Sequence, residues 1–190
     1  MQTFIENYIQ DSINIKEKLL KDKTILVKIE KAAETIINAY KSSNKVLIAG
    51  NGGSAADSQH IAAELVAKFC SDRAALNAIA LTTNTSILTS IENDWGHEFV
   101  FARQIQAYGQ KGDVFIAIST SGESINIIKA VEEAKTKGLT IIGLTGMKNC
   151  TLDSLCDLVI KVPSETTPII QESHIMIGHI ICAIIEKSLF

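Results

Sequence analysis

Two pairs of polar side chains, each on one face of an expected helix, are the groups in this sequence best suited to chemistry. His60 and Glu64 are four residues apart in "SQHIAAEL", a spacing that puts them on one helical face. Gln171 and His179 are eight residues apart in "QESHIMIGH", close to two turns, with His174 on an adjacent stripe. Two imidazoles, a carboxylate and an amide could bind a divalent metal, and zinc suits these ligands best.

The same residues also have plainer interpretations. A His–Glu pair at this spacing is often a surface contact, and a histidine in an apolar helix is often a hydrogen-bonded core residue. Residues 61–63 and 65–67 are all Ile, Ala, Leu or Val, however, which indicates a largely buried helix. Because a buried carboxylate needs a partner, Glu64 favours a polar cluster, and metal binding is one alternative for that cluster.

A second candidate group is the run of hydroxyl side chains in "STSGES", which precedes an expected helix at 124–138. Backbone N–H groups and the helix dipole attract an anion there even without Lys or Arg. Ordinary capping by Ser121 or Ser124 is the alternative, but capping needs a single hydroxyl. Four hydroxyls therefore favour a phosphate group as the ligand, and they belong to Ser119, Thr120, Ser121 and Ser124.

The glycine-rich turn "GNGGSA", residues 50–55, fits the dinucleotide-binding fingerprint in which Ala replaces the third Gly. A dinucleotide site also needs an acidic residue at the end of the second strand, and that strand ends "IALTTN". Neither glycine-rich turn has the Gly-Lys-Ser/Thr ending of a P-loop. The glycines instead predict a tight turn that lets the backbone approach a small ligand, with Ser54 as the N-cap of the next helix.

The hydrophobic pattern predicts the elements that must position these groups. Residues 1–43 lack Gly and Pro and carry apolar residues at helical spacing, which indicates two amphipathic helices with a break near 21–24. Beyond them, short apolar runs alternate with helical patterns, which is typical of a parallel sheet covered on both faces. The expected strands are 45–50, 75–81, 113–119, 140–146 and 158–163, and the main helices are 54–69, 124–138 and 167–187.

We therefore expect an α/β fold, a three-layer sandwich with a five-stranded parallel sheet that is preceded by two N-terminal helices. Residues 1–190 would form a single domain, with a helical extension at 1–43 and an α/β core at 44–190. Ligands of such sheets bind at the carboxyl ends of the strands, near the switch in strand order. The glycine-rich turn and the hydroxyl run both follow strands, so both would lie at that edge.

Composition narrows the class of protein further. A net charge of −3 without a basic block gives no sign of nucleic-acid binding. The N-terminus has acidic residues and no apolar core, unlike a signal peptide, and the longest apolar run, "IMIGHIICAII", is too short for a bilayer and suits a buried helix. The four cysteines form no CxxC pair, so we expect reduced thiols in the cytoplasm and packing of Cys70 and Cys182 as small hydrophobic residues.

Five segments together resemble the sugar isomerase (SIS) domain family. They occur in order across nearly the whole chain, as "GNGGSAADSQHIAAELVAKF", "NDWGHEFVFARQI", "GDVFIAISTSGESINIIKA", "GLTIIGLTG" and "QESHIMIGH". Each motif alone is weak, whereas the combination is specific.

Within that family the chain resembles isomerases that convert D-sedoheptulose 7-phosphate to D-glycero-D-manno-heptose 7-phosphate, the first step toward ADP- or GDP-activated heptose for lipopolysaccharide, capsule or other glycans. The resemblance implies a cytoplasmic homotetramer with one zinc ion per subunit. It implies zinc ligands at His60, Glu64, Gln171 and His179. It implies substrate contacts, to which we add Ser54 at the phosphate site, from Asn51, Gly52, Gly53, Glu64, Asn93, Asp94, Ser119, Thr120, Ser121, Ser124 and Gln171.

The implied reaction moves a proton from C1 to C2 of the sugar through an enediolate. Glu64 and His179 are the expected acid–base pair, with Glu64 favoured as the C1 base and zinc polarising the C2 carbonyl. Two positions depart from the pattern of the resemblance, because Ile169 stands where an Arg is expected and His97 where Tyr is common. Both departures concern substrate contacts, and neither removes an expected ligand.

Two readings without catalysis stay open. A non-catalytic SIS protein of the DnaA initiator-associating type has a similar length and fold and acts by binding a protein. Glu64 is the feature that separates the two, since that group is expected to lack an acid at this position. A sugar-phosphate-sensing regulator usually carries an added DNA-binding domain, for which this chain has no room.

Overall fold

A five-stranded parallel sheet forms the middle layer of the computed structural model, which describes residues 1–190. The strand order is β2-β1-β3-β4-β5, so the order switches at β1, between β2 and β3. The sheet confirms the expected fold class. Its strands are β1 (Val46–Gly50), β2 (Ala78–Ala80), β3 (Val114–Ile118), β4 (Thr140–Thr145) and β5 (Leu158–Lys161).

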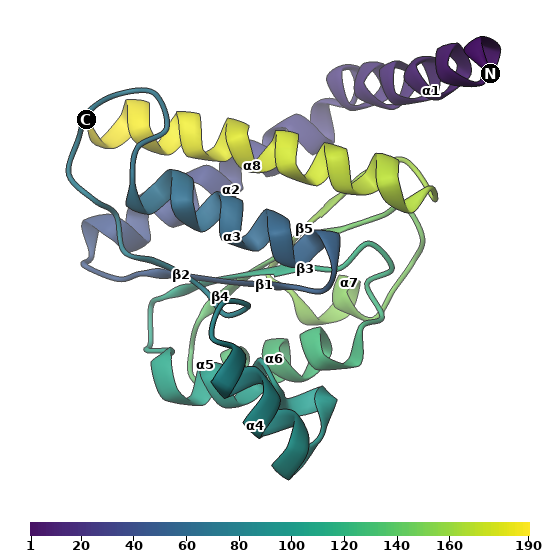
Figure 1. The fold of residues 1–190 in the computed structure, drawn as a ribbon. Helices are drawn as coiled ribbons and strands as arrows, with labels where there is room; N and C mark the ends of the chain where they lie inside the picture. Colours follow the sequence, from purple (N-terminus) through teal and green to yellow (C-terminus); the bar gives the residue numbers. More distant parts are fainter.

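Helices cover both faces of the sheet (Figure 1). Along β1, Val46 and Ile48 enter the apolar cluster on one face, whereas Leu47 and Ala49 enter the cluster on the other, as the two-residue period of a strand requires. The first cluster includes α2 (Lys23–Lys41), α3 (Gly53–Val66) and α8 (Thr167–Leu189). The second includes α4 (Thr85–Trp95), the 3-10 turn η1 (His97–Phe99), α5 (Ala102–Tyr108), α6 (Ile125–Thr136) and α7 (Leu152–Leu155).

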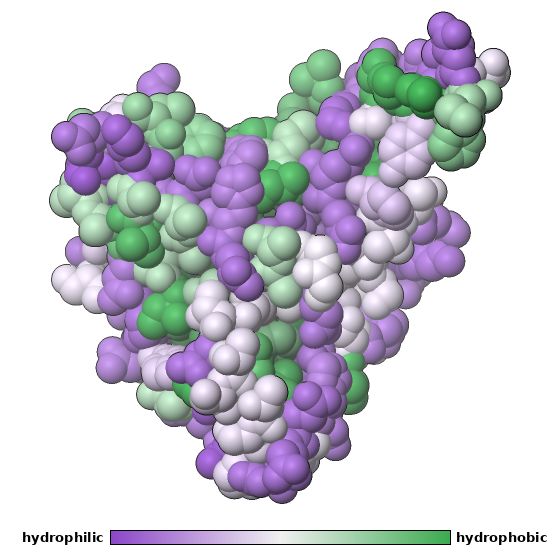
Figure 2. Space-filling view, viewed as in Figure 1, coloured by the Kyte–Doolittle hydropathy of each residue, from purple (hydrophilic) through white to green (hydrophobic).

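The two N-terminal helices break where the sequence predicted, but they differ in packing. Helix α1 (Gln2–Lys21) ends before Asp22, whose carboxylate accepts the N–H groups of Thr24 and Ile25 and so caps α2. Helix α2 packs against α8 and β5, whereas most of α1 projects from the body as an arm (Figure 1). Apolar side chains of α1 lie exposed on that arm (Figure 2), namely Phe4, Ile5, Tyr8, Ile9 and Ile13.

Helix α3 starts one residue earlier than expected, and this makes one capping prediction wrong. The N-cap is Gly52, whose φ of 55° is a left-handed conformation that glycine tolerates, and no side chain caps this end. Ser54 therefore lies inside the first turn, 3% exposed, and its carbonyl accepts the Ser58 hydroxyl. Helix α3 also ends at Val66, so Cys70 lies exposed in the following loop and does not pack as a small hydrophobic residue, whereas Cys182 is buried as expected.

Helix α8 is 23 residues long and apolar enough for length and composition alone to allow a membrane span. The apolar run around His179 is itself too short for a bilayer, but the helix that contains it is longer than that run. Half of the most apolar 18-residue segment of α8 is buried, and α8 packs against α2 and α3. Both observations support the expected core helix.

Candidate active site

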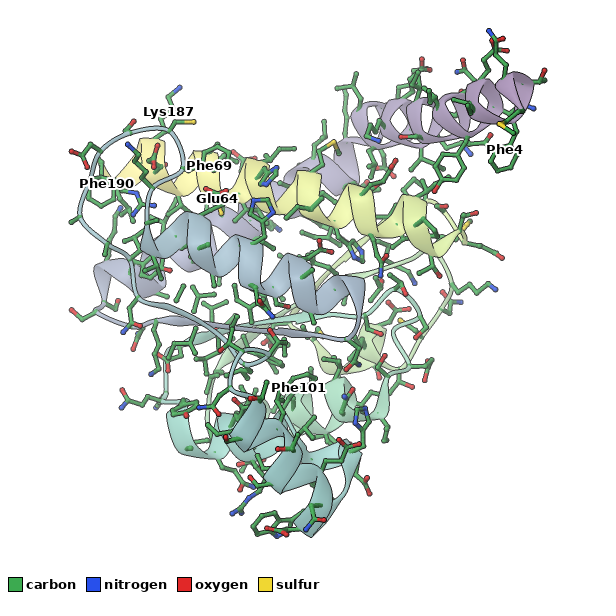
Figure 3. The ribbon with its side chains drawn as sticks, viewed as in Figure 1. Phe4, Glu64, Phe69, Phe101, Lys187 and Phe190 are labelled. Atoms are coloured by element: carbon green, nitrogen blue, oxygen red, sulfur yellow. The ribbon has the colours of Figure 1, made fainter.

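His60, Glu64 and His179 converge between α3 and α8. The two helices lie side by side (Figure 1) and pack against one another. His60 Nε2 lies 3.0 Å from Glu64 Oε1 and 3.5 Å from His179 Nε2. One ligand atom from each of the three residues falls within 4.8 Å of the others. In Figure 3, Glu64 lies beside Phe69 at this place, and the Phe69 ring is 5.7 Å from that of His179.

The donor atoms of this cluster fit a metal ion. A single nitrogen of His60 faces both a carboxylate and another imidazole nitrogen, and one proton on His60 serves only one of them. A cation between the three atoms would be bound by all of them, and two imidazoles with one carboxylate form a common catalytic zinc set that leaves positions open. The cluster is also accessible, since the side chains of His60 and Glu64 are 50% and 22% exposed. The sequence predicted a largely buried helix around Glu64, and this was wrong for the face of α3 that carries His60 and Glu64.

Gln171 lies beside the glycine-rich turn. A Cβ atom added at Gly53 would lie 2.7 Å from Gln171 Nε2, so the amide covers the start of α3. His179 follows two turns later on α8 and meets His60 further along α3. The structure thus places Gln171 next to Gly53, and its role as a metal ligand stays a prediction.

His174 is the core histidine of α8. It is completely buried, and its Nε2 donates to the carbonyl of Thr145 at 3.2 Å. Burial lowers the pKa of His174 to about 4, so the ring is neutral at physiological pH. The sequence pattern alone does not show which histidine of α8 is the hydrogen-bonded core residue, and His179 was the one for which that alternative was considered.

The hydroxyl run forms a compact group at the start of α6. Ser119 Oγ lies 3.0 Å from Ser124 Oγ, and it accepts the N–H of Gly122 at 3.1 Å. Ser121 Oγ accepts the N–H of Glu123 at 3.2 Å. Ser124 occupies the N-cap position of α6, yet its side chain makes no capping hydrogen bond. Capping therefore does not account for this hydroxyl, which favours the anion-binding interpretation.

A cavity of about 260 Å³ lies beside this run. Thr120, Ser121 and Glu123 line one side of it. The other lining residues are 146–149, Ser164, Glu165, Thr167 and Ile170. The Lys148–Glu165 ion pair, at 3.1 Å, joins those two segments. The cavity therefore opens at the carboxyl edge of the sheet, where the sequence predicted ligand binding.

A second pocket of about 220 Å³ follows β1. Its lining includes Asn51, Gly52, Glu92 and His97. Asn51 exchanges two hydrogen bonds with Asn126, which is 1% exposed. Asn126 was not predicted as a functional residue, although an amide next to the apolar residues Ile125, Ile127 and Ile128 was a signal that could have revealed it.

Asn93 and Asp94 lie apart from the groups described so far. Both are exposed at the end of α4, and Asn93 Nδ2 donates to Asp94 Oδ1 at 2.8 Å. Neither lines the two pockets above. Their expected contact with substrate stays a prediction.

Comparison with known proteins identifies the family of this chain. The model of the SIS domain family matches residues 7–146. The phosphoheptose isomerase of Aneurinibacillus thermoaerophilus is 56% identical over 190 residues, which cover all of this chain and 96% of that protein.

Two solved structures of phosphoheptose isomerases share the fold over 98% of both chains. The protein from Neisseria gonorrhoeae superposes with a TM-score of 0.92 at 38% identity. The protein from Francisella tularensis superposes with a TM-score of 0.94 at 34% identity. The chain thus belongs to the SIS domain family and, within it, to the phosphoheptose isomerases.

Proposed function

We propose that this enzyme interconverts D-sedoheptulose 7-phosphate and D-glycero-D-manno-heptose 7-phosphate. The convergence of His60, Glu64 and His179 between α3 and α8 carries the proposal, because it joins acid–base groups and metal ligands at one accessible place. The 56% identity to a named phosphoheptose isomerase over the full chain supports the choice of substrate. The product would serve as a precursor of activated heptose for lipopolysaccharide, capsule or another glycan.

The sugar phosphate would bind along the carboxyl edge of the sheet. The hydroxyl run and the N–H groups at the start of α6 suit the phosphate, with Ser119, Thr120, Ser121 and Ser124 as donors. Asn51, Gly52 and Gly53, with Gln171 beside them, would contact the sugar hydroxyls. Ser54, Asn93 and Asp94 complete the proposed contact set, the last two from the end of α4.

Glu64 and His179 would move the protons of the isomerisation. Glu64 would take the proton from C1 while the electrons of that C–H bond form the C1–C2 double bond and the π electrons of the C2 carbonyl move to O2, which gives an enediolate. The same carboxyl group returns a proton to C2, and His179 carries the proton between O1 and O2, so that protons balance over the cycle. Glu64 has one oxygen near His60 and a second oxygen without a hydrogen-bond partner, which leaves it open to substrate.

We propose one zinc ion per subunit, held by His60, Glu64, Gln171 and His179. The donor set of the cluster supports this choice, and zinc would supply Lewis-acid stabilisation of the charge that develops on the sugar oxygens. A carboxylate bound to a cation is a weaker base, so Glu64 would bind it through one oxygen and keep the other for the substrate.

We also propose that the enzyme is a cytoplasmic homotetramer. Contiguous apolar side chains such as those of α1 are unusual on a free monomer surface and suit contacts between copies of one chain. A phosphorylated sugar as substrate fits a cytoplasmic location. Neither nucleic acid nor membrane has a part in the proposal.

Incubation with D-sedoheptulose 7-phosphate, followed by NMR, tests the reaction. We expect resonances of the aldoheptose phosphate to appear, and we expect a chelator to abolish them and added zinc to restore them. Full turnover in the presence of the chelator would refute the role of the metal. A folded protein that gives no product under any of these conditions would favour the non-catalytic alternative.

A further inference from the structure

The inference concerns three side chains around the pocket that follows β1. Asn51 and His97 line this pocket of about 220 Å³, and Asn126 lies behind them on α6. His97 comes from η1, on the other side of the glycine-rich turn, and its side chain is 59% exposed. Asn126 is buried, so its polar atoms depend on the two neighbours for hydrogen bonds.

Asn51 and Asn126 form a reciprocal amide pair. Asn51 Nδ2 donates to Asn126 Oδ1 at 2.8 Å, and Asn126 Nδ2 donates to Asn51 Oδ1 at 2.9 Å. Such a pair is equally well satisfied when both amides turn over, because each carries a donor and an acceptor. The pair alone therefore does not decide whether Asn51 presents its remaining N–H or its free oxygen lone pair to a given side of the pocket.

His97 removes this ambiguity. Asn126 Nδ2 lies 3.0 Å from His97 Nε2, so an imidazole nitrogen with a free lone pair accepts the second N–H of Asn126. Glu92 Oε1 lies 3.6 Å from His97 Nδ1, and this carboxylate favours the proton on Nδ1 and the lone pair on Nε2. Turning the amide pair over would place the Asn126 oxygen against that lone pair, which is repulsive.

We propose that His97, acting through Asn126, sets the orientation of the Asn51 amide toward the sugar. His97 is thus a positioning residue, and it determines which hydroxyl of the substrate Asn51 recognises as donor and which as acceptor. The inference rests on the proposed function, in which Asn51 contacts the substrate.

Three substitutions at His97 test whether an acceptor atom facing Asn126 fixes the orientation of the amide pair. His97→Glu offers only acceptor atoms toward Asn126 and should retain the KM for D-sedoheptulose 7-phosphate within about twofold. His97→Leu leaves both orientations of the pair populated, so KM should rise about two- to fivefold, since only part of the enzyme is competent. His97→Lys offers only donors to Asn126 and favours the inverted pair, so KM should rise about tenfold or more. The kcat should stay within about threefold in all three, because Glu64 and His179 are unchanged.

The decisive experiment repeats the series in an Asn126→Leu background. If His97 acts through Asn126, the three His97 variants lose their ranking and share one raised KM. If His97 touches the substrate directly, the ranking persists, and this would overturn the inference. Lys129→Gln, on the exposed face of α6, serves as the matched control that should keep the wild-type KM. Melting temperatures confirm that every variant is folded.

The outcomes also distinguish this inference from the proposed function. Absence of turnover in the folded wild-type protein would refute the proposed function and, with it, the inference. Turnover in the wild type with the same KM in the Glu, Leu and Lys variants would refute the inference alone.

Discussion

Two polar groups join α3 to α8, and they differ in how completely their atoms are paired. The first is the cluster of His60, Glu64 and His179, in which nitrogen lone pairs and a carboxylate face one another at an accessible place. The second, which we call the Glu186 network, lies toward the end of both helices. In it, Glu186 accepts the N–H groups of three consecutive residues, 69–71, at 2.8–3.0 Å, and Arg73 donates to the same carboxylate at 3.1 Å.

We call the Glu186 network closed because its hydrogen bonds run between groups of the protein itself. Arg73 also donates to the carbonyls of Glu64 and Leu65, which end α3 without helical partners. The side chains of Arg73 and Glu186 are 2% and 7% exposed, so water has little part in it. A buried network whose charged groups are already paired stabilises the fold and leaves few free donors or acceptors for a ligand.

A ligand site and a stabilising hydrogen-bond network differ in how many of their polar atoms stay unpaired. Both groups contain a glutamate and a cationic or imidazole partner, the partner of Glu186 being Arg73 in the loop after α3, so residue types alone do not separate them. The difference is that the cluster keeps unpaired acceptor atoms directed at one point and accessible to solvent. Four predictions, in order of decreasing effect, test whether this difference has the consequences that we assign to it.

The largest effect should come from Glu64→Gln. Loss of the carboxylate removes the proposed C1 base, so kcat should fall by about 10³-fold or more. Exchange of the substrate C1 hydrogen with deuterium from solvent, followed by NMR, should stop, while phosphate binding to the hydroxyl run persists. Continued exchange at the wild-type rate would rule out Glu64 as the base.

Removal of one cluster imidazole should act on metal binding. His60→Ala deletes one proposed ligand, so the affinity for zinc should fall by about 100-fold or more, as measured by equilibrium dialysis. The melting temperature should change little, because His60 is half exposed. Glu17→Gln, on the exposed face of α1, is a control that should keep full zinc binding. Unchanged zinc affinity in His60→Ala would place the metal elsewhere.

Opening the closed network should act on stability instead. Arg73→Met leaves the Glu186 carboxylate with its backbone donors only and leaves the Glu64 carbonyl unpaired, while the Leu65 carbonyl keeps the N–H of Leu76. The melting temperature should fall by about 5–10 °C in calorimetry, while zinc stoichiometry at low temperature stays at the wild-type value. A variant that melts at the wild-type temperature but loses zinc would show that the Glu186 network supports metal binding and not stability.

The smallest effect concerns the acid dependence of stability. Burial by itself would raise the pKa of Glu186, but hydrogen bonds from residues 69–71 and from Arg73 lower it to about 2. Because the folded pKa lies below the unfolded one, the ionised carboxylate stabilises the fold above about pH 4.5, and this contribution is lost as pH falls toward 2.

Glu186→Gln tests this sign directly. The variant should melt below the wild type at pH 7, and the gap between their melting temperatures should narrow as pH falls from about 5 to 2. Scanning calorimetry across that range measures the gap. A gap that stays constant would mean that ionisation of Glu186 does not contribute to the network.

Much of the fold follows from local sequence. Strands such as Val46–Gly50 are short apolar runs that only a sheet buried on both faces accommodates, and the amphipathic pattern of 1–43 predicted both helices and the break at Asp22. The short α7 and the early start of α3 at Gly53 were missed, because each depends on one turn of backbone geometry.

The pairing of His60 with Glu64 also follows from the chain alone, since a four-residue spacing on a helix brings two side chains together in any tertiary context. The packing of α8, in contrast, selects which of its histidines joins them. His174 and His179 are five residues apart on one helix, and the packing of α8 against the sheet buries the first beside Thr145 and turns the second toward α3.

The same holds for the links of Asn51 to Asn126 and of Arg73 to Glu186, which span 75 and 113 residues. Such contacts leave no periodic trace in the chain, because they form only when the sheet has brought distant helices to their places.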